Sequence, residues 1–136
     1  MKICIITVYN SLNCGSFLQA YALMKILQEK GHDVVFLKTG VKKPGIETIK
    51  EIVKSLLKFN LSEALFYAIK YLKFNREHKI FNTLPFRRRA LKTCDLFIFG
   101  SDEIWNVARK DFAKYPILWG HGIPYDTFIA YAPSIN

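Results

Sequence analysis

The stretch ICIITVYNSLNCGSFLQAYAL, Ile3 to Leu23, joins an apolar strand, a polar loop and the start of a helix. Ile3 to Val8 is a nearly continuous apolar run rich in β-branched residues, which is typical of a strand buried on both faces of a parallel sheet. Gly31 follows the helix as a left-handed cap. Before it, apolar residues recur at the spacing of one helix face: Ala20, Leu23, Met24 and Leu27.

The same alternation continues along the chain. We expect strands at Asp33–Leu37, Asp95–Phe99 and Thr127–Ala132, and an amphipathic helix from Ile46 to Leu57 with lysines along its opposite side. Asn60 and Glu63 have the spacing of a capping box that opens a third helix. The pattern predicts an α/β fold: a Rossmann-like or flavodoxin-like, doubly wound parallel sheet of about four strands with helices on both faces, the first strand lying between the second and third.

Size and composition favour one folded domain, residues 1–136, with 51% hydrophobic and 15% aromatic residues. The formal net charge of +9 favours anionic partners. No nucleic-acid motif accompanies the charge, so we expect no nucleic-acid partner. Three widely spaced cysteines, without a C-x-x-C pair, fit a reducing cytoplasm. No signal peptide and no membrane-spanning run is indicated.

The segment from Ile46 to Phe74 interleaves lysines with apolar and aromatic side chains. This pattern fits a peripheral membrane contact through basic helices. It also fits a solvated helical face, because lysine stems routinely cover apolar surface.

Ligands of open α/β sheets bind outside the carboxyl ends of strands, where the winding direction reverses. The first strand is followed by TVYNSLNCGS and the third by GSDEIWN. We expect Ser16 and Gln19 to share the core-facing stripe of the first helix and to look over the sheet edge into a cleft. Alternatively, Asn13 is an N-cap, and Ser16 and Gln19 satisfy loop backbone groups.

Gly100, Ser101 and Asp102 follow the third expected strand, so we expect them at the same edge of the sheet. Asp102 could accept protons or hydrogen bonds from sugar hydroxyls, or it could cap a helix together with Ser101. Trp105 could stack on a sugar ring, although a core position is the better prediction for a tryptophan. No standard nucleotide phosphate loop and no metal-ligand spacing is present. His32 and His78 look like solvent-facing residues on charged stretches.

Three motifs together are similar to those of the polysaccharide pyruvyl transferase family. They are N-x-x-N-x-G-S-x-L-Q-A-Y-A-L from Asn10 to Leu23, F-G-S-D-E-I-W-N from Phe99 to Asn106, and A-Y-A-P-S from Ala130 to Ser134. The resemblance spans nearly the whole chain but only the N-terminal half of such enzymes. It implies the N-terminal domain of a GT-B-type two-domain transferase.

Members of this family transfer a pyruvyl group from phosphoenolpyruvate to sugar hydroxyls of a cell-surface glycan or its precursor. The resemblance therefore implies a sugar or glycan acceptor, phosphoenolpyruvate as donor substrate and no cofactor. It implies Asp102 as the catalytic residue, which orients or deprotonates a hydroxyl. It places the following residues in substrate binding: Asn10, Asn13, Gly15, Ser16, Gln19, Gly100, Ser101, Glu103, Trp105 and Ser134.

Two departures stand out. Glu103 replaces the usual Gln, and Pro133 and Ile135 replace residues of the commoner Ala-Ser-Phe-Gly ending. The Arg and His groups that would hold phosphoenolpyruvate belong to a second half, so we expect a missing C-terminal donor domain and an inactive fragment. An apolar strand at Thr127–Ala132, with nothing after it to cover it, favours the same expectation. A non-catalytic glycan- or nucleotide-sugar-binding module and a GT-B-type glycosyltransferase half remain alternatives.

Overall fold

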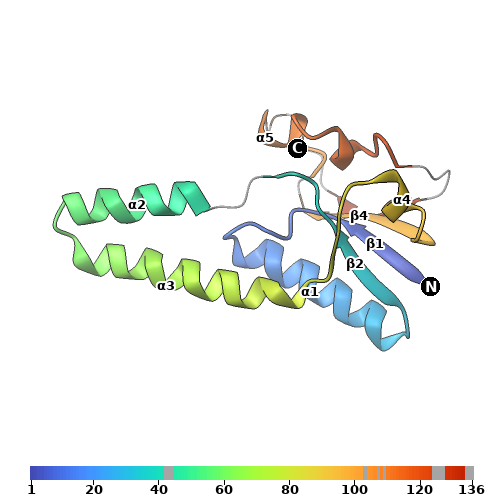
Figure 1. Cartoon of the computed structure of the whole chain (residues 1–136), viewed down its shortest axis with the longest axis horizontal. Coiled ribbons are helices and arrows are strands. Elements are labelled where there is room, and N and C mark those ends of the chain that lie inside the picture. The colour runs from blue at the N-terminus through green and yellow to red at the C-terminus, as the bar shows by residue number, and fades with distance from the viewer. Residues whose placement is uncertain (42–44, 103, 107, 109, 124–127, 134–136) are drawn as a thin grey trace.

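The computed structural model describes residues 1–41, 45–102, 104–106, 108, 110–123 and 128–133 (Figure 1). Its strands and helices alternate in chain order as the sequence patterns predict. The strands are β1 (Lys2–Ile6), β2 (Asp33–Leu37), β3 (Thr83–Leu84), β4 (Leu96–Asp102) and β5 (Phe128–Pro133). The helices are α1 (Cys14–Glu29), α2 (Gly45–Leu57), α3 (Leu61–Glu77), α4 (Arg88–Leu91) and α5 (Lys110–Ala113), with short 3₁₀ turns η1 (His78–Ile80) and η2 (Pro116–Trp119).

The strands form one parallel sheet in the order β3-β2-β1-β4-β5. This order confirms the predicted α/β fold. As predicted, β1 lies between β2 and β4, which are the second and third strands expected from the sequence. The added strand is β3, which pairs with β2 through Phe36 and Thr83. Sequence pattern missed β3 because two residues are too few to show an alternation.

The sheet buries a separate apolar layer on each face. Ile3 and Ile5 point toward α1, where they join Ala20, Leu23 and Met24 in one buried cluster. Cys4 and Ile6 point to the other face and pack with Leu91 of α4 and Leu118 of η2. Each face is therefore covered, but by a long helix on one side and by short turns on the other (Figure 1).

Local signals set the ends of α1 as expected. Gly31 has φ +80°, and its N–H donates to Gln28 O while the His32 N–H donates to Leu27 O. These two bonds are the Schellman motif, which needs a residue that tolerates the left-handed region. The predicted glycine cap is therefore confirmed.

Two of the three cysteines are part of the core. Cys4 and Cys94 are buried in the same cluster, whereas Cys14 is exposed. Burial raises the pKa of the Cys4 thiol, and the neighbouring Cys94 thiol raises it further. Burial also raises the pKa of Cys94. Both thiols stay protonated near neutral pH, so we assign them a packing role.

Helices α2 and α3 form a hairpin, residues 45–77, that extends away from the sheet (Figure 1) and is called the arm below. The predicted capping box is formed in part: the Glu63 N–H donates to Asn60 Oδ1 over 3.1 Å, but the Glu63 carboxylate accepts from the side-chain Nδ2 of Asn60 over 3.2 Å, and the Asn60 backbone N–H donates to Ser55 O. Phe59, at the turn, has φ +55°. No described helix is both long enough and apolar enough to cross a membrane.

Candidate functional site

The winding direction of the sheet reverses between β1 and β4. The chain moves outward from β1 to β2 and β3 on one side, and from β4 to β5 on the other. Ile6 is in register with Phe99, so both strands end at the same edge of the sheet. The loop after β1 and the last residues of β4 therefore leave from neighbouring strands, which is the expected place for a ligand.

Asn10 links the loop after β1 to the segment that follows β2 by a hydrogen bond. Its Nδ2 donates to the Val41 carbonyl oxygen over 3.1 Å. Its Oδ1 is buried and has no hydrogen-bond partner among the described residues. A buried acceptor without a donor costs about 1–3 kcal/mol, so this atom is a place where a ligand or water could donate a hydrogen bond.

Asn13 is the N-cap of α1, as the structural alternative predicts. Its Oδ1 accepts from the Gly15 N–H over 2.8 Å, and its own N–H donates to Ser11 Oγ. A Cβ atom on Gly15 would lie 3.2 Å from Asn13 Oδ1, which is a tight contact. The spacing of Asn13 and Gly15 therefore has a local reason, namely that the glycine leaves room for the cap.

Ser16 and Gln19 differ in burial. Ser16 is buried on the face of α1 that carries Ala20 and Leu23, as expected. Gln19 differs from the expectation of a shared face, because its side chain is exposed.

Strand β4 is longer than predicted and includes the polar residues that were expected in a loop. Gly100 is buried, has φ +111° and pairs with Tyr131, and Asp102 ends the strand in register with Pro133. Positive φ at a buried position explains the glycine. The residues described between Asp102 and Lys110, namely 104–106 and 108, are not helical, so the structure gives no support to the alternative that Ser101 and Asp102 cap a helix.

Trp105 packs against the core but is not fully buried, so it agrees in part with the predicted core position. Its Nε1 donates to the Leu118 carbonyl oxygen over 2.9 Å, and its half-buried ring packs against the cluster that contains Phe99. Asn106 beside it is buried and accepts from the Ala108 N–H over 2.9 Å. Both residues thus hold the turn that leaves β4. The side chains of Ser101 and Asp102, and all of Glu103 and Ser134, lie outside the described part of the structure.

His78 is the main residue that sequence reasoning missed, since the expectation of a solvent-facing side chain is wrong. Its Nε2 lies 2.6 Å from Tyr9 O and its Nδ1 lies 2.8 Å from Phe74 O. Aromatic rings of Phe17, Phe74 and Phe81 surround it. The imidazole therefore joins the end of α3 to the loop after β1, through contacts too distant in sequence to leave a local signal.

We expect His78→Phe to lower the free energy of unfolding by about 1–2 kcal/mol, because a ring of similar shape stays against Phe74 while the imidazole hydrogen bonding to the carbonyl oxygens of Tyr9 and Phe74 is lost. Urea denaturation measures the change. His32→Phe is the matched control and should stay within about 0.5 kcal/mol. Equal losses in the two variants would contradict the linking role of His78.

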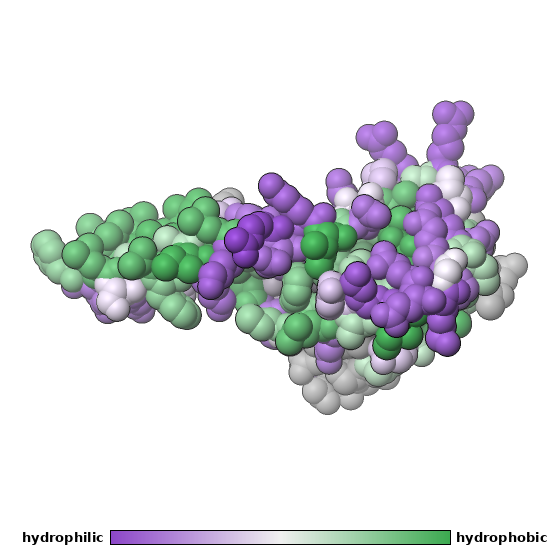
Figure 2. All heavy atoms as spheres, turned by 90° about the horizontal axis from the view of Figure 1, so that it is seen from below, coloured by the Kyte–Doolittle hydropathy of each residue, from purple (hydrophilic) through white to green (hydrophobic). Residues whose placement is uncertain are grey.

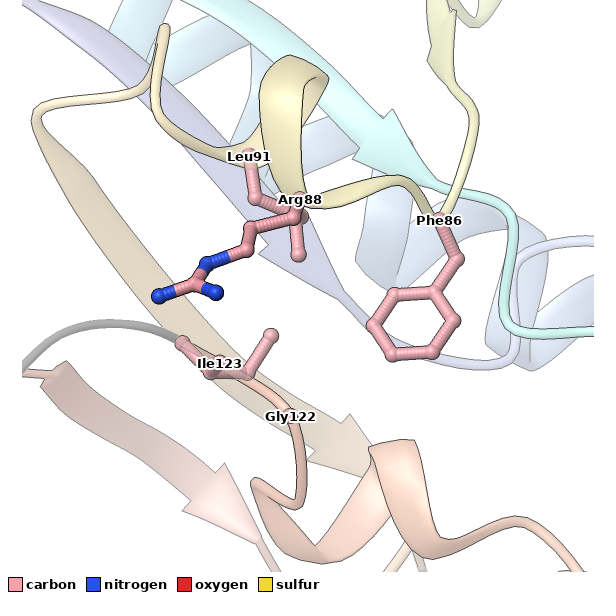
Figure 3. A pocket seen from close by; sticks show the side chains of 5 residues that line it. All are labelled: Phe86, Arg88, Leu91, Gly122 and Ile123. Atoms are coloured by element: carbon pink, nitrogen blue, oxygen red, sulfur yellow. The ribbon is translucent and has the colours of Figure 1, made fainter.

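An open cavity of about 390 Å³ lies between α4 and the turn after η2. Figure 3 shows the Arg88 side chain reaching across it toward Ile123, with the Phe86 ring on the far side and Leu91 behind. A guanidinium beside apolar walls could hold an anion with a small apolar part. None of the residues that line this cavity belongs to β1 or β4. The described residues hold no group of three or more metal-ligating side chains.

The parallel, doubly wound sheet with polar residues at the β1–β4 edge is consistent with a Rossmann-like fold. The family model described as polysaccharide pyruvyl transferase matches residues 13–135, and the chain belongs to this family. The match includes α1 and the end of β4. No curated protein and no solved structure matches the chain significantly.

Proposed function

We propose that the chain is the acceptor-side half of an enzyme that transfers a pyruvyl group from phosphoenolpyruvate to a sugar of a cell-surface glycan or its precursor. The family match over residues 13–135 carries this proposal. The position of Asp102 supports it, because it ends β4 at the switch point of the sheet. The buried Oδ1 of Asn10, which has no partner in the described part of the chain, supports a ligand with hydroxyl donors near the same edge.

The reaction joins two sugar hydroxyls to one carbon of the donor. The methylene carbon of phosphoenolpyruvate gains a proton, the first hydroxyl oxygen bonds to C2, and inorganic phosphate leaves with the bonding electrons of the C2–O bond. The second hydroxyl oxygen then closes the ketal. The two hydroxyl protons end on the new methyl group and on phosphate, so the reaction needs no oxidant and no cofactor. A carboxylate that accepts a hydroxyl proton would accelerate the additions.

Six residues of the edge have a role in this proposal. Asp102 orients or deprotonates the acceptor hydroxyl, while Asn10 and Gln19 bind the sugar. Gly15 and Gly100 give close backbone approach to the ligand, and Asn13 fixes the start of α1. The proposed location is the cytoplasm, with the donor held by a second domain of GT-B type.

The test uses phosphoenolpyruvate with methyl glycosides of glucose, galactose and mannose as acceptors. Both the 136-residue chain and the complete reading frame that contains it are assayed for phosphate release and for the ketal methyl signal by NMR. We expect an acceptor-dependent ketal from the complete frame. Transfer from a nucleotide sugar without any ketal would instead identify a glycosyltransferase. Saturable sugar binding that is insensitive to phosphoenolpyruvate, with no transfer, would identify a binding module.

A further inference from the structure

The arm presents its large apolar side chains to solvent. On α2, Ile49, Val53 and Leu57 recur every four residues and are all exposed. On α3, Leu61, Leu65, Ile69 and Leu72 form a second exposed stripe at helical spacing. Figure 2, seen from below, shows the face of the arm in mostly hydrophobic colours, in contrast to the polar body of the molecule. A contiguous apolar surface of this kind marks an interaction site.

The buried side chains among the described residues of the arm are small. Helices α2 and α3 pack on each other, and the described side chains that are buried there are Thr48, Ser55 and Ala64. At the base, a Cβ atom on Gly45 would come within 3.2 Å of Tyr71 Oη, so the backbones approach closely there. A hairpin that folds in water normally does the reverse and buries its leucines. Small residues between helices with leucines outside are typical of helices that contact lipid.

Lysines border the apolar stripe of α2. Ile49, Val53 and Leu57 line an open groove together with Lys50, Lys54 and Lys58. The expectation that these lysines lie opposite the stripe is therefore wrong. From residue 50 to residue 73 the chain has five lysines and two glutamates. An apolar helix face with a basic border is the pattern of helices that lie in the interface of anionic membranes.

The geometry points to a bilayer that contains anionic lipids as the partner of the arm. The most exposed side chains, Leu57 at 76%, Phe59 at 93% and Leu61 at 72%, lie on both sides of the turn and form an apolar apex. An apex can enter the acyl boundary of a membrane, whereas a twofold contact between two copies would bring their lysine rows together. Anionic headgroups instead supply the opposite charge.

Cosedimentation with vesicles tests the inference on the full chain. We expect binding to vesicles of phosphatidylcholine and phosphatidylglycerol, and weaker binding to phosphatidylcholine alone. The double variant Leu57→Ser and Leu61→Ser should bind at least about tenfold more weakly, because it removes two apolar anchors. The double variant Lys54→Gln and Lys58→Gln should lose about tenfold on the anionic vesicles.

Ile26→Ser is the matched control, because Ile26 is exposed on α1, outside the arm, and should bind vesicles like the unmodified chain. Circular dichroism verifies that each variant is folded. In Phe59→Trp we expect an additional blue-shifted emission with anionic vesicles. The inference is overturned if the unmodified chain does not sediment with anionic vesicles. It is equally overturned if the leucine variant binds as tightly as Ile26→Ser, or if that variant changes only the oligomeric state in sedimentation velocity.

Discussion

Asp102→Asn is expected to lower kcat for pyruvyl transfer by about 10²- to 10⁴-fold in the complete enzyme, because an amide cannot accept the acceptor hydroxyl proton. Asn keeps nearly the same shape, so the fold and the position of the strand end should be unchanged. The KM for phosphoenolpyruvate should also be unchanged, since the lost interaction belongs to the transition state. Steady-state phosphate release at several acceptor concentrations measures both constants.

The fold explains why this residue, among the acidic residues of the chain, is chosen. Asp102 is the last residue of β4, the strand next to β1, and its backbone is held by pairing with Pro133. The carboxyl ends of β1 and β4 meet where the winding reverses. The backbone of a paired strand end is held more firmly than that of a free loop, which suits a residue that must meet a hydroxyl.

Asp95→Asn is the matched control, since Asp95 lies just before the opposite end of the same strand and its Oδ2 accepts from the Lys2 N–H over 2.6 Å. An amide oxygen can still accept that bond, so activity should stay within about twofold of the unmodified enzyme. A loss in Asp95→Asn as large as that in Asp102→Asn would point to general destabilisation. Full activity of Asp102→Asn would remove the proposed base.

The sheet could be predicted because its central strands consist of continuous runs of apolar residues. Runs such as Ile3–Ile6 and Val34–Leu37 are buried on both faces, which leaves a strong one-dimensional signal. The sequence pattern predicts that this strand ends at Phe99, whereas β4 ends at Asp102, because Gly100 and the two polar residues after it resemble a loop. Pairing with β5 keeps them in the strand, and no local pattern records that pairing.

Contacts at the candidate site also differ in whether a local sequence pattern can predict them. The Asn13 cap acts over two residues and was anticipated as an alternative. The bond from Asn10 to Val41 spans 31 residues and that from His78 to Tyr9 spans 69, so neither leaves a periodic signal. In the arm, the spacing of the apolar residues predicts amphipathic helices. This spacing does not show whether the apolar face of a helix is covered by another part of the protein.

Phe36→Ala is expected to cost about 3–5 kcal/mol in the free energy of unfolding, because it leaves a cavity in a close-packed layer. The Phe36 ring is fully buried, with its centroid 5.0 Å from that of Tyr9 and 4.7 Å from that of Phe81. Typical domains have only about 5–15 kcal/mol in total, so the variant should melt well below the unmodified chain. Urea denaturation with a shared slope measures the difference.

Phe59→Ala makes the same chemical change at a side chain that is 93% exposed, and it should alter the free energy of unfolding by less than about 0.5 kcal/mol. The two variants separate the two roles that phenylalanine has in this chain. Phe36 supports the loop after β1 through Tyr9, so its loss should also weaken any ligand binding at the β1–β4 edge. Phe59 should matter only when vesicles are present. A large loss of stability in Phe59→Ala would mean that the arm tip is packed in solution, and a small loss in Phe36→Ala would contradict the buried layer beneath α1.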